Sequence, residues 1–199
     1  MAEALPVQLQ GSPTARALLR LAGWRVLFDG LPARQGVLIV YPHTSNWDLV
    51  IGVFAKWTIG IQVTFWGKDT LFRVPLLGTW LRWLGGVPVD RAARHGSVGQ
   101  MAQALVDARE RNQFCWLALT PEGTRRYRDA WRSGFYHVVM RASVPLGVVC
   151  FDYRRREVGI RNFLKLSGDV GRDMANIAAI LGTCTGRHPA QAAPIRLEA

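Results

Sequence analysis

The sequence is poor in cysteine and lysine, and it lacks the motifs that mark metal sites and nucleic-acid binders. Its three cysteines, Cys115, Cys150 and Cys184, are widely spaced and do not have the spacing of metal ligands. We interpret them as small buried residues in a reducing compartment. Only three of the 25 basic residues are lysines, and no RNA-binding signature accompanies the arginines. A metal site is therefore not expected, and nucleic acid is a weak candidate partner.

Targeting signals, repeats and long apolar runs are also missing. Residues 1–13 are polar and contain prolines, which predicts a flexible N-terminus without a signal peptide. The longest apolar tract, residues 49–66, is interrupted by Lys56 and Gly60, so it divides into a helix and a strand better than it forms one transmembrane span. With 49% hydrophobic and 20% charged residues over 199 positions, the composition is that of one globular domain.

Positive charge and tryptophan are abundant instead. The net charge is +11 and there are eight tryptophans, a combination that favours an anionic membrane surface as partner. Residues 14–28 place leucines, a tryptophan and arginines at helical spacing, which predicts an N-terminal amphipathic helix. This helix would lie either on a bilayer or against the rest of the domain. Residues 73–84, with two arginines and two tryptophans, have the same two interpretations.

Apolar strands alternate with amphipathic helices along the rest of the chain. Strands are predicted at 36–41, 61–66, 85–89, 114–119 and 145–151, with a hairpin near 153–167, and helices at 48–59, 75–84, 97–112, 133–142 and 171–181. This order predicts an α/β fold, a single domain over residues 14–185 in which helices flank a largely parallel central sheet. Residues 186–199 are expected to form an irregular tail.

The junction between the predicted strand 36–41 and helix 48–59 carries a histidine and an aspartate. Ser45 is placed to cap the helix, and Asp48 follows it at the spacing of a capping box. His43 then lies in the loop at the carboxyl end of the strand, within reach of Asp48. A carboxylate on one imidazole nitrogen leaves the other nitrogen free to accept a proton. The alternative is that Asp48 only caps the helix and His43 is an incidental loop residue.

Two other predicted strand ends carry groups that suit a phosphate. The strand at 85–89 is followed by Arg91, and the strand at 114–119 by the run Glu122-Gly123-Thr124-Arg125. Because sites collect at the carboxyl ends of parallel strands, these loops are expected to meet His43. Glycine lets the backbone approach a ligand, and a hydroxyl with two guanidiniums makes a phosphate clamp. Taken singly, each loop is also compatible with an ordinary solvated turn.

Four ordered blocks between roughly residues 36 and 150 form a recognisable set. They are a histidine and an aspartate five positions apart, a lysine-led segment with leucine, proline and glycine, a glycine-led strand ending in arginine, and a Pro-Glu-Gly-Thr-Arg run. In this sequence they are met by His43, Ser45 and Asp48, by Lys68, Leu71, Pro75 and Gly78, by Gly86 and Arg91, and by Pro121 to Arg125, with Arg132, Gly134 and Pro145 following. On these residues the sequence resembles the glycerolipid acyltransferase family, best known for its 1-acylglycerol-3-phosphate acyltransferases.

The resemblance implies transfer of a fatty acyl group from acyl-CoA or acyl-carrier protein to a hydroxyl of a lysophospholipid. The expected acceptor is 1-acylglycerol-3-phosphate, in phospholipid biosynthesis. His43 and Asp48 would form the catalytic dyad, without a covalent acyl-enzyme. The substrate phosphate would be bound by Arg91, Glu122, Gly123, Thr124 and Arg125, with Ser45, Lys68 and Arg132 as supporting residues.

The expected localisation is the cytoplasmic face of the membrane, where the protein would be peripheral or monotopic. Apart from the acyl thioester as co-substrate, no cofactor is expected. Two other functions fit the same residues. A hydrolase of acyl thioesters or lipids would use the same dyad with water as acceptor. A non-catalytic lipid-binding module of the membrane surface would keep the fold and the charge but would not need an intact dyad.

Overall fold

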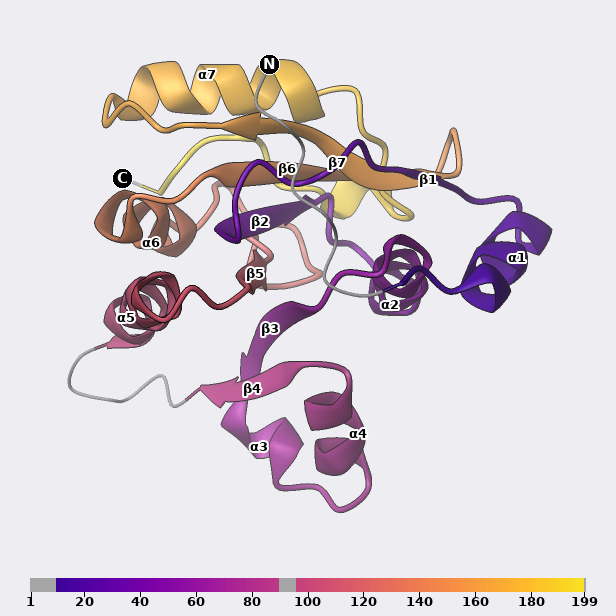
Figure 1. Ribbon diagram of the computed structural model, residues 1–199. Helices are drawn as coiled ribbons and strands as arrows, with labels where there is room; N and C mark the ends of the chain where they lie inside the picture. The colour runs from indigo at the N-terminus through magenta and orange to yellow at the C-terminus, as the bar shows by residue number, and fades with distance from the viewer. Residues whose placement is uncertain (1–9, 90–95, 199) are drawn as a thin grey trace.

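The computed structural model describes residues 10–89 and 96–198, and its centre is a seven-stranded sheet. The strands are β1 (Arg25–Leu27), β2 (Gln35–Tyr41), β3 (Val63–Lys68), β4 (Gly86–Val89), β5 (Cys115–Leu119), β6 (Leu146–Asp152) and β7 (Glu157–Leu164). Their order in the sheet is β1-β7-β6-β2-β5-β3-β4 (Figure 1). The strands from β6 to β4 are parallel to one another, whereas β7 runs antiparallel to β6. The predicted α/β fold with a largely parallel sheet is confirmed.

Helices cover both faces of this sheet, and two short ones, α3 (Asp69–Phe72) and α4 (Leu77–Trp83), lie beyond its β3–β4 edge (Figure 1). The others are α1 (Pro13–Leu21), α2 (Trp47–Ile59), α5 (Gly96–Glu110), α6 (Gly134–Ala142) and α7 (Val170–Leu181). Alternation along β2 sends Val37 and Ile39 into a core shared with α5, α6 and α7, and sends Leu38 into a second core with α1 and α2. Both faces are buried, which is why the parallel strands are almost continuously apolar.

The N-terminal helix is shorter than the predicted segment 14–28. It ends at Leu21, and residues 25–27 form the edge strand β1 instead of a further helical turn. Gly23 adopts a φ of +77°, a left-handed conformation that ends a helix and that glycine adopts without strain. Leu19 packs in the core shared with α2, whereas Leu18 and Leu21 are exposed. The helix is therefore amphipathic and is held against the domain by one face.

The predicted helix 75–84 is also shorter in the structure. Residues 69–72 form a separate short helix, α3, and α4 begins only at Leu77. Leu76, directly before α4, has a φ of 62°, so the chain turns sharply after Pro75 rather than starting a helix there. Leu81 and Leu84 of this segment are buried, as a core-packed helix requires.

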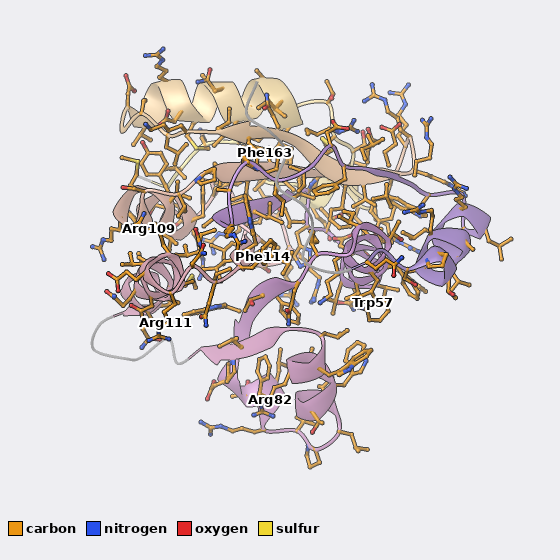
Figure 2. All side chains as sticks on the ribbon, viewed as in Figure 1. Trp57, Arg82, Arg109, Arg111, Phe114 and Phe163 are labelled. Carbon is orange, nitrogen blue, oxygen red and sulfur yellow. A yellow bond between two sulfur atoms is a disulfide. The ribbon has the colours of Figure 1, made fainter. Side chains whose placement is uncertain are left out.

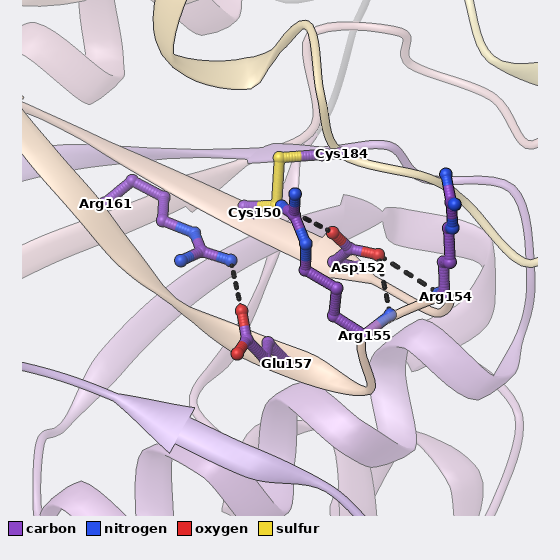
Figure 3. The surroundings of a disulfide bond; sticks show 7 residues. All are labelled: Cys150, Asp152, Arg154, Arg155, Glu157, Arg161 and Cys184. Atoms are coloured by element: carbon purple, nitrogen blue, oxygen red, sulfur yellow. Dashed lines mark hydrogen bonds and ion pairs between the residues drawn. A yellow bond between two sulfur atoms is a disulfide. The ribbon is translucent and has the colours of Figure 1, made fainter.

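Two of the cysteines form a disulfide, which contradicts the expectation that they are reduced. Cys150 near the end of β6 is bonded to Cys184, which follows α7, with their Cα atoms 6.0 Å apart (Figure 3). The expectation failed because α7 returns the chain to β6, so residues 34 positions apart meet. Beside them Asp152 accepts hydrogen bonds from the backbone N–H groups of Arg154 and Arg155 and shapes the β6–β7 turn. Cys115 is free, and burial raises the pKa of its thiol.

The tight packing of Trp116 on β2 predicts the effect of two glycine substitutions. A Cβ added at Gly36 would lie 2.3 Å from Trp116 Cη2, whereas one at Gly99 in α5 would meet nothing closer than 4.0 Å. We expect Gly36→Ala to lower the free energy of unfolding by about 1–3 kcal/mol through overpacking. Gly99→Ala should raise it by about 0.5–1 kcal/mol. Urea unfolding of both variants measures this, and equal changes would contradict the packing described.

Candidate active site

The carboxyl ends of three adjacent parallel strands carry the polar side chains of the site. His43 follows β2, Glu122 follows β5 and Tyr153 follows β6. Because β2 pairs with both β5 and β6, these ends lie together at one edge of the sheet. This is the edge at which parallel α/β sheets collect their ligands. The fold thus brings together loops that are far apart in the sequence.

His43 and Asp48 are in contact, as the spacing predicted. His43 Nδ1 lies 3.2 Å from Asp48 Oδ2, although the contact lacks the alignment of a full hydrogen bond. The histidine side chain is 15% exposed and the aspartate side chain 2% exposed, so the imidazole lies between solvent and a buried carboxylate. Hydrogen bonds in catalytic pairs commonly tighten when substrate binds. The arrangement suits an imidazole that takes a proton while the carboxylate stabilises the imidazolium.

Asp48 is held by the start of α2 and by a tyrosine. Its Oδ2 accepts the backbone N–H groups of Thr44 and Ser45, each at 2.9 Å, and its Oδ1 accepts the Tyr153 hydroxyl at 2.5 Å. Ser45 Oγ in turn accepts the Trp47 N–H at 3.2 Å. Asp48 thus accepts the Ser45 N–H as the predicted capping box requires, but Ser45 Oγ binds the N–H of Trp47 rather than that of Asp48, and α2 is capped at Asn46. Burial opposes ionisation of Asp48 most strongly, but the nearby His43 imidazole and the hydrogen bonds from Tyr153 and Ser45 together hold its pKa below the usual value.

Glu122 supports the histidine loop from the other side. It is 1% exposed, and its two oxygens accept the backbone N–H groups of His43 at 2.6 Å and Ala193 at 3.0 Å. Burial, the largest influence, raises the pKa of Glu122 although both hydrogen bonds favour its charged form. The sequence placed Glu122 among the residues that bind the substrate phosphate. With both oxygens bound to backbone N–H groups, it is placed instead to fix the backbone.

The remaining predicted phosphate-binding residues lie in an accessible loop after β5. Gly123 and Arg125 are exposed, and Gly123 has a φ of 65°. Arg132 packs over this glycine, where a Cβ would lie 3.0 Å from the Arg132 Nε. Thr124 is half-buried, and its hydroxyl accepts the N–H of the next-but-one residue.

Two further predicted residues are placed only in part. Lys68 is the last residue of β3, whose carboxyl end lies at the site edge. Arg91 lies outside the described residues, so its place in the site stays a prediction.

The C-terminal tail contacts the site, which the sequence did not indicate. His188 N–H donates to Thr44 Oγ1 at 3.2 Å, and the Tyr41 hydroxyl donates to the Ala193 carbonyl at 3.1 Å. With its amide turned to donate, Gln191 reaches the carbonyl oxygens of Arg125 at 2.7 Å and Thr44 at 3.3 Å. The tail thus joins the loops after β2 and β5. Its sequence has no periodic pattern from which these contacts could have been predicted.

Tyr153 is the second contribution that sequence reasoning missed. Its ring packs edge-on against Trp24, with 4.9 Å between ring centroids. Burial, together with the hydrogen bond to Asp48, raises the pKa of the Tyr153 phenol well above its usual value, so the hydroxyl remains a donor. A signal was present, because Tyr153 lies just after the strand predicted at 145–151, and sites collect at the carboxyl ends of parallel strands.

An apolar hollow lies beside Tyr153. It has a volume of about 410 Å³ and is lined mainly by apolar side chains of α1 and α2, with Arg156 and Arg187 among its polar residues. The Arg187 guanidinium lies 5.6 Å from the centre of the Trp47 ring. The hollow therefore combines a hydrocarbon wall with two cations.

Neither a metal cluster nor a membrane span is found within residues 10–89 and 96–198. No three histidine, cysteine, aspartate or glutamate side chains of this part gather as metal ligands. None of the helices described is long and apolar enough to cross a bilayer.

Comparison with known proteins gives a consistent result. The model of the acyltransferase family matches residues 25–152. The 1-acyl-sn-glycerol-3-phosphate acyltransferase of Streptococcus pneumoniae (strain ATCC BAA-255 / R6) is 29% identical over 102 residues, which is 51% of this chain and 36% of that protein. The matched region is therefore only about a third of that relative's length.

A solved structure has the same fold. The crystal structure of the 1-acyl-sn-glycerophosphate (LPA) acyltransferase PlsC from Thermotoga maritima matches with a TM-score of 0.53 and 16% identity. The match covers 83% of this chain and 73% of that one. At this identity the likeness shows the fold alone.

The Tyr153–Asp48 hydrogen bond predicts a pH-dependent loss of stability in Tyr153→Phe. Because the folded-state pKa of Asp48 is lowered, its stabilisation is present above the unfolded-state pKa and is lost as the pH falls through the folded-state value. Removing the hydroxyl should lower the free energy of unfolding by about 1.5–3 kcal/mol at neutral pH.

Urea unfolding of the wild type and the variant between neutral pH and about pH 2 measures the difference, which should persist down to about pH 4 and narrow below it as Asp48 is protonated. Tyr127→Phe is the matched control, because Tyr127 is 55% exposed and its change should stay within about 0.5 kcal/mol. A difference between wild type and Tyr153→Phe that is the same at every pH would contradict the role of Asp48.

Proposed function

The chain belongs to the acyltransferase family, and we propose that it transfers a fatty acyl group from an acyl thioester to a hydroxyl of a lysophospholipid. The contact of His43 with the buried Asp48 at the site edge carries this proposal. The expected acceptor is 1-acylglycerol-3-phosphate, and the donor is acyl-CoA or acyl-carrier protein. The names of the S. pneumoniae and T. maritima proteins support this acceptor and a place in phospholipid biosynthesis.

In the proposed reaction His43 is the general base. Its Nδ1 faces Asp48, so its Nε2 takes the proton of the acceptor hydroxyl. The hydroxyl oxygen attacks the thioester carbonyl carbon, and the carbon–sulfur bond breaks. The leaving sulfur then takes the proton back from the imidazolium, which regenerates the neutral histidine. The acyl group passes directly to the acceptor, without a covalent acyl-enzyme.

The loop after β5 would bind the acceptor's phosphate. Arg125 is exposed there, and Arg132 is held against the same loop by its packing over Gly123. A guanidinium binds a phosphate through two parallel N–H groups, which fixes the orientation as well as the position of the lipid. Thr124 and Arg91 complete the clamp in this proposal. Glu122 acts indirectly, by fixing the backbone of His43.

The apolar hollow beside Tyr153 would hold a hydrocarbon chain of one lipid substrate, since apolar side chains form most of its lining. No cofactor takes part in the proposed reaction apart from the acyl thioester. The positive net charge of +11 supports an anionic membrane surface as partner, and we place the protein at the cytoplasmic face, peripheral or monotopic.

Replacing the proposed base tests the reaction. Purified protein is mixed with oleoyl-CoA and lysophosphatidate in detergent, and free CoA is followed by thiol detection. His43→Ala should lower the rate of acceptor-dependent CoA release by about 10²–10⁴-fold, because general-base catalysis contributes that factor. His137→Ala is the matched control, since His137 is exposed on α6 and should leave the rate unchanged.

Each other outcome of this assay points to a different function. Release of CoA without lysophosphatidate, still dependent on His43, would identify a thioesterase. Full activity in His43→Ala would remove His43 from the mechanism. If no release occurs with oleoyl-CoA, with an acyl-carrier-protein thioester or with other lysolipids, the non-catalytic lipid-binding module is favoured.

If the loop after β5 binds the acceptor's phosphate, a substitution there should change the KM for the acceptor but not the KM for the acyl thioester. Arg125→Ala should raise the KM for the acceptor by roughly tenfold or more, because a charge-assisted hydrogen bond contributes about 1.5–3 kcal/mol. The KM for oleoyl-CoA should change little. Arg111→Ala is the control, because Arg111 lies between α5 and β5, at the amino end of that strand (Figure 2). Equal increases in both KM values would argue against a phosphate contact.

A further inference from the structure

Large apolar side chains are exposed in one short part of the chain. Of the fourteen such side chains exposed in the described residues, six lie on or beside α3 and α4. We call them the α3–α4 surface: Leu71, Val74, Leu76, Leu77, Trp80 and Trp83. Leu76 is 86% exposed and Trp83 is 69% exposed. Concentrated exposure of this kind is rare on soluble monomers and marks an interaction surface.

The backbone beneath this surface is firmly built. Helices α3 and α4 project beyond the β3–β4 edge of the sheet (Figure 1). A Cβ at Gly78 would lie 2.2 Å from the Phe72 carbonyl oxygen, so the two helices touch through backbone. Leu76 has a φ of 62°, a strained value for a branched residue, and its side chain points into solvent. The strained backbone at Leu76 therefore holds an apolar side chain in solvent.

The charges on the surface indicate what covers it. Arg73 and Arg82 are both exposed, and Arg73 pairs with Asp69 at 2.7 Å. The Arg82 guanidinium of α4 lies 5.5 Å from the centre of the Phe72 ring of α3 (Arg82 is labelled in Figure 2). Tryptophan and arginine together are typical of the water–lipid interface, where apolar rings and cationic heads share one depth. A second copy of the chain would instead bring arginine against arginine.

We propose that the α3–α4 surface docks the protein onto an anionic lipid bilayer. The apolar side chains enter the interfacial layer, and Arg82 meets lipid phosphates. Helix α3 follows directly from the carboxyl end of β3, so docking brings the bilayer to the sheet edge that carries His43. The value of this arrangement rests on the proposed function, because a lipid acceptor reaches the site from the membrane. Binding itself needs no turnover and is tested separately.

Vesicle co-sedimentation of the full chain measures the docking. The vesicles are phosphatidylcholine alone, and phosphatidylcholine mixed with phosphatidylglycerol. The double variant Leu76→Ser/Trp80→Ser should partition at least tenfold more weakly onto the mixed vesicles, which corresponds to about 1.4 kcal/mol. The matched control is Met140→Ser/Val170→Ser, which changes two exposed apolar residues elsewhere and should bind like the wild type.

A charge variant tests whether anionic lipid contributes to binding. It also keeps the proposal testable if Leu76→Ser/Trp80→Ser does not fold. Arg82→Gln should bind mixed vesicles about fivefold more weakly, since one arginine near an anionic surface contributes about 1 kcal/mol. It should bind phosphatidylcholine vesicles like the wild type, and high salt should remove the difference. Circular dichroism and urea unfolding establish that each variant is folded.

Several results would overturn the proposal. They are unchanged binding of both variants, an equal loss in the Met140/Val170 control, and equal binding of wild type to both vesicle types. A dimer in size-exclusion chromatography that Leu76→Ser/Trp80→Ser dissociates would identify a second copy as the occupant. If the vesicle binding is as expected but the protein releases no CoA, the proposed reaction is wrong and the docking surface is still supported.

Discussion

The buried carboxylate of Asp48 is the group on which the site depends. A carboxylate as deeply buried as that of Asp48 is costly unless the protein replaces its hydration. Two backbone N–H groups at the start of α2 and the Tyr153 hydroxyl supply that replacement. The charge is therefore already stabilised before a substrate arrives. The negative charge of Asp48 acts directly on the His43 imidazole. The loop that carries His43 is bound to the same carboxylate oxygen, Oδ2, through the backbone N–H groups of Thr44 and Ser45.

A second buried carboxylate, Glu122, completes the frame but behaves differently. Asp48 has an imidazole, a phenol and backbone donors, and its pKa is lowered. Glu122 has two backbone donors and deeper burial, and its pKa is raised. The comparison assigns the two groups different tasks: Asp48 presents charge to the imidazole, and Glu122 fixes the positions of three segments. Those segments are the β2 loop, the β5 loop and the tail at Ala193.

The sequence predicted the parts of the structure that local patterns encode. The strand before His43, the helix that begins beside Asp48 and the hydrogen bond from Ser45 N–H to Asp48 all follow from spacing over a few residues. The missed contacts join residues far apart: Tyr153 lies 105 positions from Asp48, and Ala193 lies 71 positions from Glu122. The Cys150–Cys184 disulfide has the same origin. Such contacts depend on how helices return the chain to the sheet, and a single sequence gives no periodic signal for that.

The segment between β3 and β4 shows a different limit of pattern reading. Helical spacing places Leu76, Trp80 and Leu81 on one apolar face, which is compatible with a core helix and with an interfacial one. The structure separates them, because the turn at Leu76 delays the helix and the short α4 buries Leu81 but leaves Trp80 outside. Trp83 still touches Trp57 of α2, with 5.6 Å between ring centroids. One end of the exposed surface is thereby tied to α2, the helix that begins with the two residues Trp47 and Asp48. The proposed contact with a bilayer and the position of Asp48 are thus linked through a single helix.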